Sequence, residues 1–304
     1  MRDQPLLTPS QLFDRLTSNG SLRRVLDAAR DEDFGREGDV TTRSIVEAGQ
    51  PAEARLVVRE AGIIAGVRTV PAVIEAFDAD LSFHALVSDG DRVAAGAPAG
   101  TLAGDRVDLL GIERTVLNVI GRLSGIATLT GRFVDAVEGT GAVICATRKT
   151  APGLRHLDKY AVACGGGDAH RLGLHDAALY KDNHLAGLPP DRLAPALSRA
   201  IERARQTADL RFVEVEVDTP EQLRRVLTID EGLVDMILLD NMDPGGLRAA
   251  VALRDAQRPD ILLEASGGVT LETVPAIAET GVDRISVGGL THSAPGLDVA
   301  VDLE

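Results

Sequence analysis

The chain has 304 residues, of which 44% are hydrophobic and only 3% aromatic, and tryptophan is absent. This length suits one large domain, or a large and a smaller one, and the apolar content predicts an aliphatic core and excludes a largely disordered chain. The net charge of −14 argues against a surface for duplex nucleic acid or anionic lipid, so we expect neither as a partner.

The two cysteines, Cys145 and Cys164, are too few for a disulfide framework and lack CxxC spacing. We expect buried free thiols in a reducing compartment, with Cys145 serving simple core packing. No run approaches the roughly 20 apolar residues that a membrane span requires, and the N-terminal residues contain no apolar core of signal-peptide length. These features predict a cytoplasmic protein.

The first third of the chain mixes helical and β-rich segments. Leucines at 12, 16, 22 and 26 indicate helices, and β-rich runs follow at 54–60 and 62–67, with a helical PAVIEAF. Asp-Gly and Gly-Pro neighbours mark turns in the segment 88–104. This pattern predicts a small α+β domain with an antiparallel sheet.

After a helical stretch at 113–139, the sequence alternates between strands and helices. Six short apolar runs lie at 142–147, 177–181, 211–217, 235–240, 261–266 and 284–290. Some of the helices between them have readable starts, with Asp218 or Thr219 before Pro220 and Asp243 before Pro244. Strands that alternate with helices predict a parallel sheet, and six units with short loops favour an incomplete barrel over a flat doubly wound sheet.

Polar residues or glycines stand at or beside the C-terminal end of every one of these runs. They are, in chain order, Arg148 and Lys149, Lys181 and Asp182, Glu214 and Glu216, Asp240 and Asn241, Ser266 to Gly268, and Gly288 and Gly289. In a parallel α/β barrel such ends line one mouth, where the active site is built. Two simpler interpretations stay open at this point: Glu214 and Glu216 could lie on an exposed edge strand, and residues 182–184 could only cap a helix.

Positive charge is concentrated near this mouth. All three lysines and four of the six histidines lie within residues 146–185, and between Thr147 and His184 six Arg and Lys stand against four Asp. Arginine binds carboxylates and phosphates with two parallel hydrogen bonds, and lysine supplies a compact charge. Two arginines and two lysines at one site predict a ligand with several negative charges.

The opposite side of the mouth is predicted to be acidic. Glu216 and Asp240 come from neighbouring strands, and such carboxylate pairs commonly hold Mg²⁺ directly or through water. The glycines after the last two strands would let backbone N–H groups approach a phosphate. The mouth is therefore predicted to hold a phosphorylated ligand, a divalent ion and a second polyanion.

Longer motifs closely resemble the quinolinate phosphoribosyltransferase family. The segment 147–185, TRKTAPGLRHLDKYAVACGGGDAHRLGLHDAALYKDNHL, carries the resemblance, together with VEVEVDTPEQL, ILLDNMDP, LEASGGVTLETV, GVDRISVGGLTHSAPGLDVAVDL and, earlier, GIERTVLNVIGRLSGIAT. The likeness covers roughly residues 20–303, in the family's order. It implies an N-terminal open-faced α/β sandwich at 1–115 and a C-terminal incomplete parallel α/β barrel at 116–304, with a tail at about 291–304 that packs on the N-terminal domain.

The resemblance also implies a reaction and an assembly. The reaction is phosphoribosyl transfer from phosphoribosyl pyrophosphate to quinolinate with decarboxylation, which gives nicotinate mononucleotide, pyrophosphate and CO₂ in de novo NAD biosynthesis. The assembly is a homodimer with shared active sites, in which the sandwich of one subunit covers the barrel mouth of the other.

Residue roles follow from the same resemblance. The implied quinolinate-binding residues are Arg114 (from across the dimer interface), Arg148, His170, Arg171 and Lys181. The implied phosphoribosyl and phosphate ligands are Lys149, Ser266, Gly267, Gly268, Gly288, Gly289 and His292. The implied catalytic residues are Lys149, Lys181, Glu216 and Asp240, of which Glu216 and Asp240 hold Mg²⁺, partly through water.

The sequence departs from the family's pattern in two places. Ala169 stands where many relatives have Asn, and the connection from Glu216 to Asp240 is a few residues longer than usual. Neither departure removes a charged group, so the implied activity stands.

Three competing functions are compatible with parts of the pattern. A paralogous phosphoribosyltransferase could act on another pyridine or aromatic acid, although Arg114, Arg148 and Arg171 together suit two carboxylates. A barrel isomerase or aldolase could use Lys181 as a base or to form a Schiff base, but one phosphate would leave several cations unpaired. A non-catalytic relative is the third possibility, and the presence of Lys181, Glu216 and Asp240 argues against it.

Overall fold

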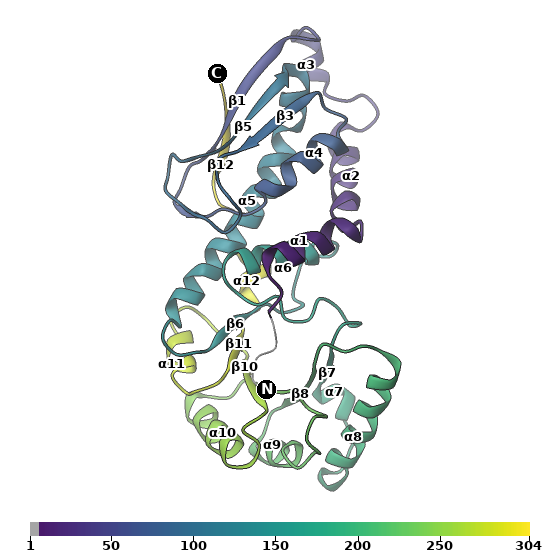
Figure 1. Ribbon diagram of the computed structural model, residues 1–304, viewed down its shortest axis with the longest axis vertical. Helices are drawn as coiled ribbons and strands as arrows, with labels where there is room; N and C mark the ends of the chain where they lie inside the picture. The colour runs from purple at the N-terminus through teal and green to yellow at the C-terminus, as the bar shows by residue number, and fades with distance from the viewer. Residues whose placement is uncertain (1–5) are drawn as a thin grey trace. The chain divides into compact units, whose positions relative to one another are not determined.

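The computed structural model describes residues 6–304, and Figure 1 shows its helices and strands. The chain forms two compact units, which are described separately. The sheet unit comprises residues 7–131, 150–166 and 290–304, and the barrel unit comprises 132–149 and 167–289. Helix α5 (Arg106–Ala136) is continuous through both the expected border at 115/116 and the observed division after residue 131.

The sheet unit is built on a four-stranded sheet in the order β12-β1-β5-β3, and all of its neighbouring strands are antiparallel. The C-terminal strand β12 pairs with β1, with Val301 opposite Leu56. The predicted antiparallel sheet is thus confirmed. The elements of this unit, apart from α5, are α1 (Pro9–Ser18), α2 (Ser21–Phe34), α3 (Val40–Ile45), β1 (Pro51–Val58), β2 (Gly62–Ile63), η1 (Val67–Thr69), α4 (Val70–Ala76), β3 (Leu81–Ala85), β4 (Arg92–Val93), β5 (Pro98–Asp105), α6 (Arg155–Cys164), α12 (Gly289–His292) and β12 (Val299–Leu303).

The barrel unit contains the six predicted strands in one parallel sheet, in the order β6-β11-β10-β9-β8-β7. Its elements are β6 (Val143–Cys145), β7 (Ala178–Tyr180), α7 (Asp182–Leu185), α8 (Pro190–Thr207), β8 (Val213–Val217), α9 (Pro220–Val226), β9 (Met236–Asp240), α10 (Pro244–Gln257), β10 (Leu262–Ser266), α11 (Val274–Ala278) and β11 (Arg284–Ser286). Figure 1 shows α8 to α11 around the outside of the strands. The incomplete parallel α/β barrel is confirmed.

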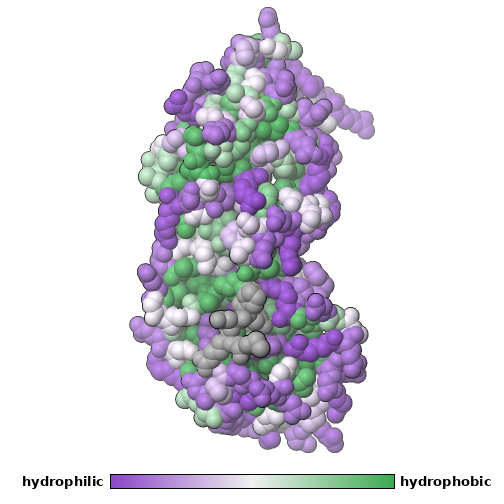
Figure 2. Space-filling view, in the orientation of Figure 1, coloured by the Kyte–Doolittle hydropathy of each residue, from purple (hydrophilic) through white to green (hydrophobic). Residues whose placement is uncertain are grey.

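Helix starts and amphipathic faces follow the sequence pattern. Thr219 caps α9 with a reciprocal capping box, and Asp243 caps α10, each followed by proline in the first turn. In α8 the buried Leu193, Leu197 and Ile201 recur every four residues. Hydrophilic residues predominate around α8 and α9 on the face shown in Figure 2. Hydrophilic residues on this part of the surface therefore cover an aliphatic interior, as the composition predicts.

The alternation along β8 separates two environments. All five residues of this strand are buried, and Val213, Val215 and Val217 alternate with Glu214 and Glu216. Because successive side chains point to opposite faces, the valines cover one face and both glutamates lie on the other. The strand lies between β7 and β9, so the interpretation of the two glutamates as residues of an exposed edge strand is wrong.

The side chains on the inward face of the barrel change in character along the strands, from apolar to charged. A buried apolar cluster of Ala177, Phe212, Met236 and Leu262 fills the N-terminal end of the strands. Two residues further along β9 and β10 come Leu238 and Glu264, which are in register with each other and with Glu216 of β8. On β8, Glu214 is in register with Met236, so the first charged side chain lies level with the apolar cluster, and Glu216 and Glu264 follow two residues further along their strands.

The cysteines and the helices meet two further expectations. Cys145 and Cys164 are buried free thiols, as predicted. In residues 6–304, no helix combines the length and apolar character needed to cross a bilayer.

Candidate active site

A cavity of about 350 Å³ opens where the barrel strands end. Eleven of the residues predicted from the sequence line it: Arg148, Lys149, His170, Arg171, Lys181, Glu216, Asp240, Ser266, Gly267, Gly268 and Gly288. Ala146, Leu179, Leu238 and Val269 add apolar surface. The predicted convergence of strand ends on one mouth is therefore observed within the barrel unit.

Three predicted residues lie elsewhere in the chain. Arg114 is exposed on α5, and His292 is exposed at the end of α12; both belong to the sheet unit. Gly289 begins α12 directly after Gly288, because β11 ends at Ser286 and is shorter than the apolar run 284–290. The cavity is therefore defined by barrel residues alone.

Lys181 and Glu216 form an ion pair at the mouth. Lys181 follows β7, and its Nζ donates to Oε2 of Glu216 on the neighbouring strand β8. Glu216 is 8% exposed and the lysine side chain 42% exposed, so the carboxylate is held from the protein side while the ammonium group reaches the cavity. Residues 182–184 form the short helix α7 itself, with Lys181 as its N-cap.

Asp240 is the last residue of β9, next to a tightly folded turn. The Nδ2 of Asn241 donates to Oδ2 of Asp240 at 2.6 Å, and the N–H of Asn241 donates to the carbonyl of Ser266 at 2.9 Å. Asn241 has φ +53°, and Gly267 has φ +104°. A Cβ on Gly267 would lie 2.1 Å from Oδ1 of Asn241, so only glycine fits there. The glycine loop after β10 therefore packs directly against the turn that follows Asp240 at the end of β9.

Cations line the side of the cavity near β6. Arg171 is buried at 7% exposure, and Arg148 lies three residues after the end of β6, followed by Lys149. The Nε of Arg148 is buried and has no hydrogen-bond partner among the described residues. A buried guanidinium N–H without a partner is costly, so this group can donate to an oxygen atom of a ligand.

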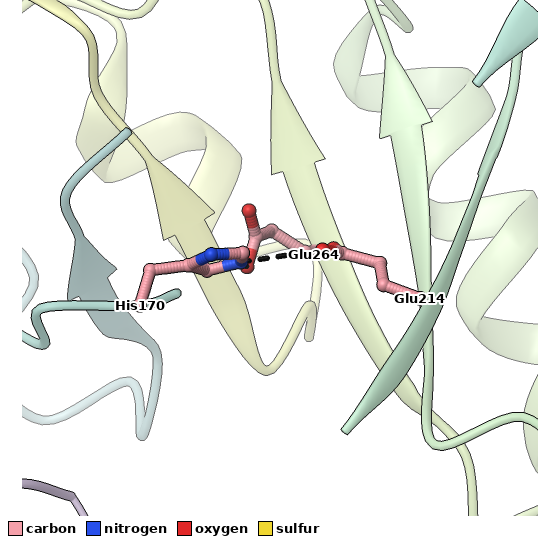
Figure 3. A group of neighbouring side chains, drawn as sticks. All are labelled: His170, Glu214 and Glu264. Carbon is pink, nitrogen blue, oxygen red and sulfur yellow. Dashed lines mark ion pairs between the residues drawn. The ribbon is translucent and has the colours of Figure 1, made fainter. Parts of the chain in front are cut away.

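A buried charged cluster lies on the floor of the cavity (Figure 3). The Nε2 of His170 lies 3.1 Å from Oε2 of Glu264 and 3.3 Å from Oε2 of Glu214, and all three side chains are at most 6% exposed. Neither approach is aligned as a hydrogen bond, so the attraction is electrostatic. Burial by itself lowers the pKa of His170, but the charges of Glu264 and Glu214 outweigh it and raise the pKa to about 9. The two carboxylates therefore favour the protonated form of His170.

The two glutamates of this cluster differ in their surroundings. Burial would raise the pKa of Glu264, but His170 and Arg284 reverse that effect and lower it. Glu214 has a raised pKa because burial and the neighbouring Glu264 dominate, and neither of its oxygens accepts a hydrogen bond from any of the described residues. Arg284 thus distinguishes Glu264, to which it donates a hydrogen bond, from Glu214.

Arg284 connects this cluster to a second carboxylate. Its Nε donates to Glu264 at 3.2 Å, and its Nη2 donates to Asp168, with all three groups buried. Glu264 and Arg284 are directly opposite each other on β10 and β11. None of these three residues was predicted from the sequence. The available signal was a charged residue in each of two apolar runs, LLEAS and RIS, where a buried charge requires a partner.

Comparison with known proteins agrees with this architecture. A family model described as Quinolinate phosphoribosyl transferase, C-terminal domain, matches residues 126–302, and the corresponding N-terminal domain model matches 39–124. The chain is 45% identical over 287 residues to nicotinate-nucleotide pyrophosphorylase (carboxylating) of Mycobacterium leprae, which covers 91% of this chain and 98% of the relative. It is 39% identical over 295 residues to quinolinate phosphoribosyltransferase (decarboxylating) 2b, mitochondrial, of Nicotiana tabacum, covering 93% of this chain and 82% of the relative.

A solved structure shows the same fold. The crystal structure of nicotinate-nucleotide pyrophosphorylase from Ehrlichia chaffeensis is similar with a TM-score of 0.82 at 36% identity, and the match covers 92% of this chain and 98% of that one. The resemblance stated from the sequence motifs is confirmed by both domain models and by these relatives. The chain therefore belongs to the quinolinate phosphoribosyl transferase family.

Proposed function

We propose that this protein transfers the phosphoribosyl group of phosphoribosyl pyrophosphate to quinolinate with decarboxylation, giving nicotinate mononucleotide, pyrophosphate and CO₂ in de novo NAD biosynthesis. The observation that carries the proposal is one cavity in which Arg148, Lys149, Arg171 and Lys181 share the lining with Glu216 and Asp240. Several cations suit two polyanionic substrates, and the names of the relatives specify the same reaction.

Quinolinate binding is assigned to the cationic side. Its two carboxylates need two anion-binding groups, which Arg148 and Arg171 supply with paired N–H donors, and His170 adds a third cation from the floor of the cavity. Lys181 reaches the same space from β7. These groups would hold the pyridine nitrogen towards the ribose, which contributes mainly by positioning.

The carboxylates face the other substrate. As pyrophosphate leaves, positive charge develops on the ribose ring at the anomeric carbon, and Glu216 and Asp240 would stabilise it electrostatically. The pyridine nitrogen then forms the new C–N bond, and the positive ring nitrogen stabilises the electron pair that stays on C2 when the 2-carboxylate departs as CO₂. A proton from solvent then takes the place of the carboxylate on C2. Lys149 and the loops at Ser266–Gly268 and Gly288–Gly289, with His292, are proposed to bind the phosphate groups.

Mg²⁺ is proposed as the cofactor, held by Glu216 and Asp240. The donor set fits, because both residues offer carboxylate oxygens at one cavity, and each has one oxygen engaged by Lys181 or Asn241 and a second one available. When bound, the ion would neutralise charge on the pyrophosphate. Turnover by EDTA-treated protein should require added Mg²⁺, and undiminished turnover without divalent ion would refute this assignment.

The assembly is proposed to be a homodimer in which Arg114 of one subunit completes the quinolinate site of the other. Arg114 is exposed on α5, which leaves its guanidinium accessible to a second subunit. Mixed dimers of Arg114→Ala and Lys181→Met chains should recover about a quarter of wild-type turnover, because half of the dimers are mixed and each mixed dimer has one intact site. If mixing restores no activity although the subunits exchange, the two residues belong to the same subunit's site.

Substitution of Gly267 tests the phosphate loop. Gly267→Ala should raise the dissociation constant for phosphoribosyl pyrophosphate about tenfold, because the new Cβ collides with Asn241 and φ +104° is strained for alanine. Isothermal titration calorimetry with the Mg²⁺ complex measures this effect. Gly245→Ala, in α10 with ordinary backbone angles, is the matched control and should bind normally.

The decisive experiment is turnover of the purified protein. With Mg²⁺ and phosphoribosyl pyrophosphate, it should convert quinolinate labelled in the 2-carboxylate to nicotinate mononucleotide and release labelled CO₂. Nicotinate should not be a substrate, because it lacks the second carboxylate that the arginines bind. Turnover of nicotinate without turnover of quinolinate would assign the chain to a paralogous activity.

A further inference from the structure

We propose that Glu264 is a positioning residue that acts through His170: it fixes the imidazole on the floor of the cavity and so sets the affinity for quinolinate. The inference rests on the proposed function, because His170 is assigned to quinolinate there. Neither the family match nor the names of the relatives assign a role to this carboxylate.

The first observation is the direct approach of the two side chains. His170 Nε2 lies 3.1 Å from Oε2 of Glu264, and both residues also line the cavity. Figure 3 shows the imidazole and the Glu264 carboxylate directed towards each other, with Glu214 reaching the same point from β8. Both side chains are almost fully buried, so their attraction is little screened by water.

The second observation is that Glu264 is itself immobilised. Arg284 donates to it at 3.2 Å from the neighbouring strand, and Ser286 forms a side-chain hydrogen bond with it. Arg284 continues to Asp168, whose backbone pairs with β6 through hydrogen bonds of 2.8 Å to Ile144 and Ala146. These contacts hold Glu264 of β10 against Arg284 of β11. They end at Asp168, which is only two residues before His170.

The third observation is backbone strain at His170. Its φ is +52°, in the left-handed region that non-glycine residues rarely adopt. Arg211 Nη1 donates to its carbonyl at 3.0 Å, and the ring of Phe212 packs edge-on at 5.1 Å. A strained conformation persists only where the surroundings over-determine it, and such residues cluster at functional sites.

Charge supports a functional role over a merely structural one. Quinolinate carries two negative charges, so a carboxylate on the floor of the cavity repels it unless nearby cations offset the repulsion. A carboxylate at this position is therefore compatible with binding only if it also strengthens a cation there. Glu264 does so by holding His170 as a cation facing the same cavity. Although His170, Glu214 and Glu264 could also group around a metal ion, Arg284 and Ser286 already occupy Glu264, which favours the ion-pair network.

The test compares Glu264→Gln with wild-type protein by calorimetric titration. The neutral amide keeps the shape but removes the charge, so the dissociation constant for quinolinate should rise about tenfold, while that for phosphoribosyl pyrophosphate should stay within about twofold. Glu264→Asp, which restores the charge at a longer distance, should recover part of the affinity. Equal weakening of both substrates, or no change in either, would overturn the proposal.

A double-mutant cycle separates positioning from general damage. In a His170→Gln background, Glu264→Gln should have almost no further effect on quinolinate affinity, because the residue acts through the histidine. If the two substitutions lowered quinolinate affinity additively, Glu264 would not act through His170. Asp283→Asn is the matched control: it breaks a partly buried ion pair with Arg254 next to β11, and it should lower the melting temperature without changing quinolinate affinity.

A milder substitution and a metal analysis also test the role of Glu264. If Glu264→Gln does not fold, Ser286→Ala removes only one hydrogen bond to Glu264 and should weaken quinolinate binding about twofold to threefold; an unchanged affinity would count against the proposal. Stoichiometric transition metal that is lost on Glu264→Gln would also overturn it. Absence of quinolinate turnover by wild-type protein would instead remove the proposed function.

Discussion

Lys181→Met is expected to lower kcat/KM for both substrates about a thousandfold while the protein stays folded. The substitution keeps the apolar stem but removes the ammonium group that pairs with Glu216 and reaches the cavity. The loss affects quinolinate binding, the balance of charge around Glu216 and the neutralisation of pyrophosphate at once, and removal of one such electrostatic group costs on the order of a hundredfold to a thousandfold. Steady-state kinetics with each substrate varied in turn measure the effect.

A matched ion pair outside the cavity controls for the loss of charge. Arg205 pairs with Asp235 at 2.9 Å, with both side chains about one third exposed, in the same unit. Arg205→Met should leave kcat/KM within about twofold of wild type, because exposed pairs contribute little and this one lies outside the cavity lining. If Lys181→Met retained kcat/KM to within threefold, the assignment of the cavity as the active site would be wrong.

Among the substitutions proposed for this protein, Arg284→Met should destabilise the fold most. We expect it to lower the free energy of unfolding by about 3–5 kcal/mol. Arg284 lies between Asp168 and Glu264, and all three side chains are at most 5% exposed. Its removal leaves two buried carboxylates without their guanidinium partner, and methionine supplies no donor. Urea denaturation followed by circular dichroism measures the change, with the slope m checked for constancy.

The control for this prediction is an exposed pair. Arg225 and Glu221 are four residues apart in α9, 3.1 Å from each other and about half exposed. Arg225→Met should change the free energy of unfolding by no more than about 0.5 kcal/mol. A loss below about 1 kcal/mol for Arg284→Met would show that the two carboxylates become protonated or solvated at little cost, and that the buried network is not a main source of stability.

The starts of elements were predictable because their signals are local. Thr219 with Pro220 and Asp243 with Pro244 begin α9 and α10 as the sequence predicts, since capping depends on a few neighbouring residues. Strand ends were less predictable. The apolar run 284–290 is a strand only to Ser286, because the glycine pair that ends it leads into α12.

The mouth of the barrel was also predictable in large part. Each strand has its polar residues or glycines within four positions of its C-terminal end, and parallel strands bring those ends together without any further information. Lys181, Glu216 and Asp240 accordingly line one cavity. Their contacts were not predictable: the pairing of Lys181 with Glu216 depends on which strands are neighbours.

What the sequence determined by itself is the kind of each element, the polar ends of six strands and the motifs of one family. Only the tertiary structure decided that Glu216 faces Lys181 while Glu214, two residues earlier, faces His170 and Glu264. It also brought Asp168 to Arg284 across 116 residues. Propensity and periodicity act over a few residues, whereas strand register and burial depend on pairing between distant segments, and these decide which buried charges meet.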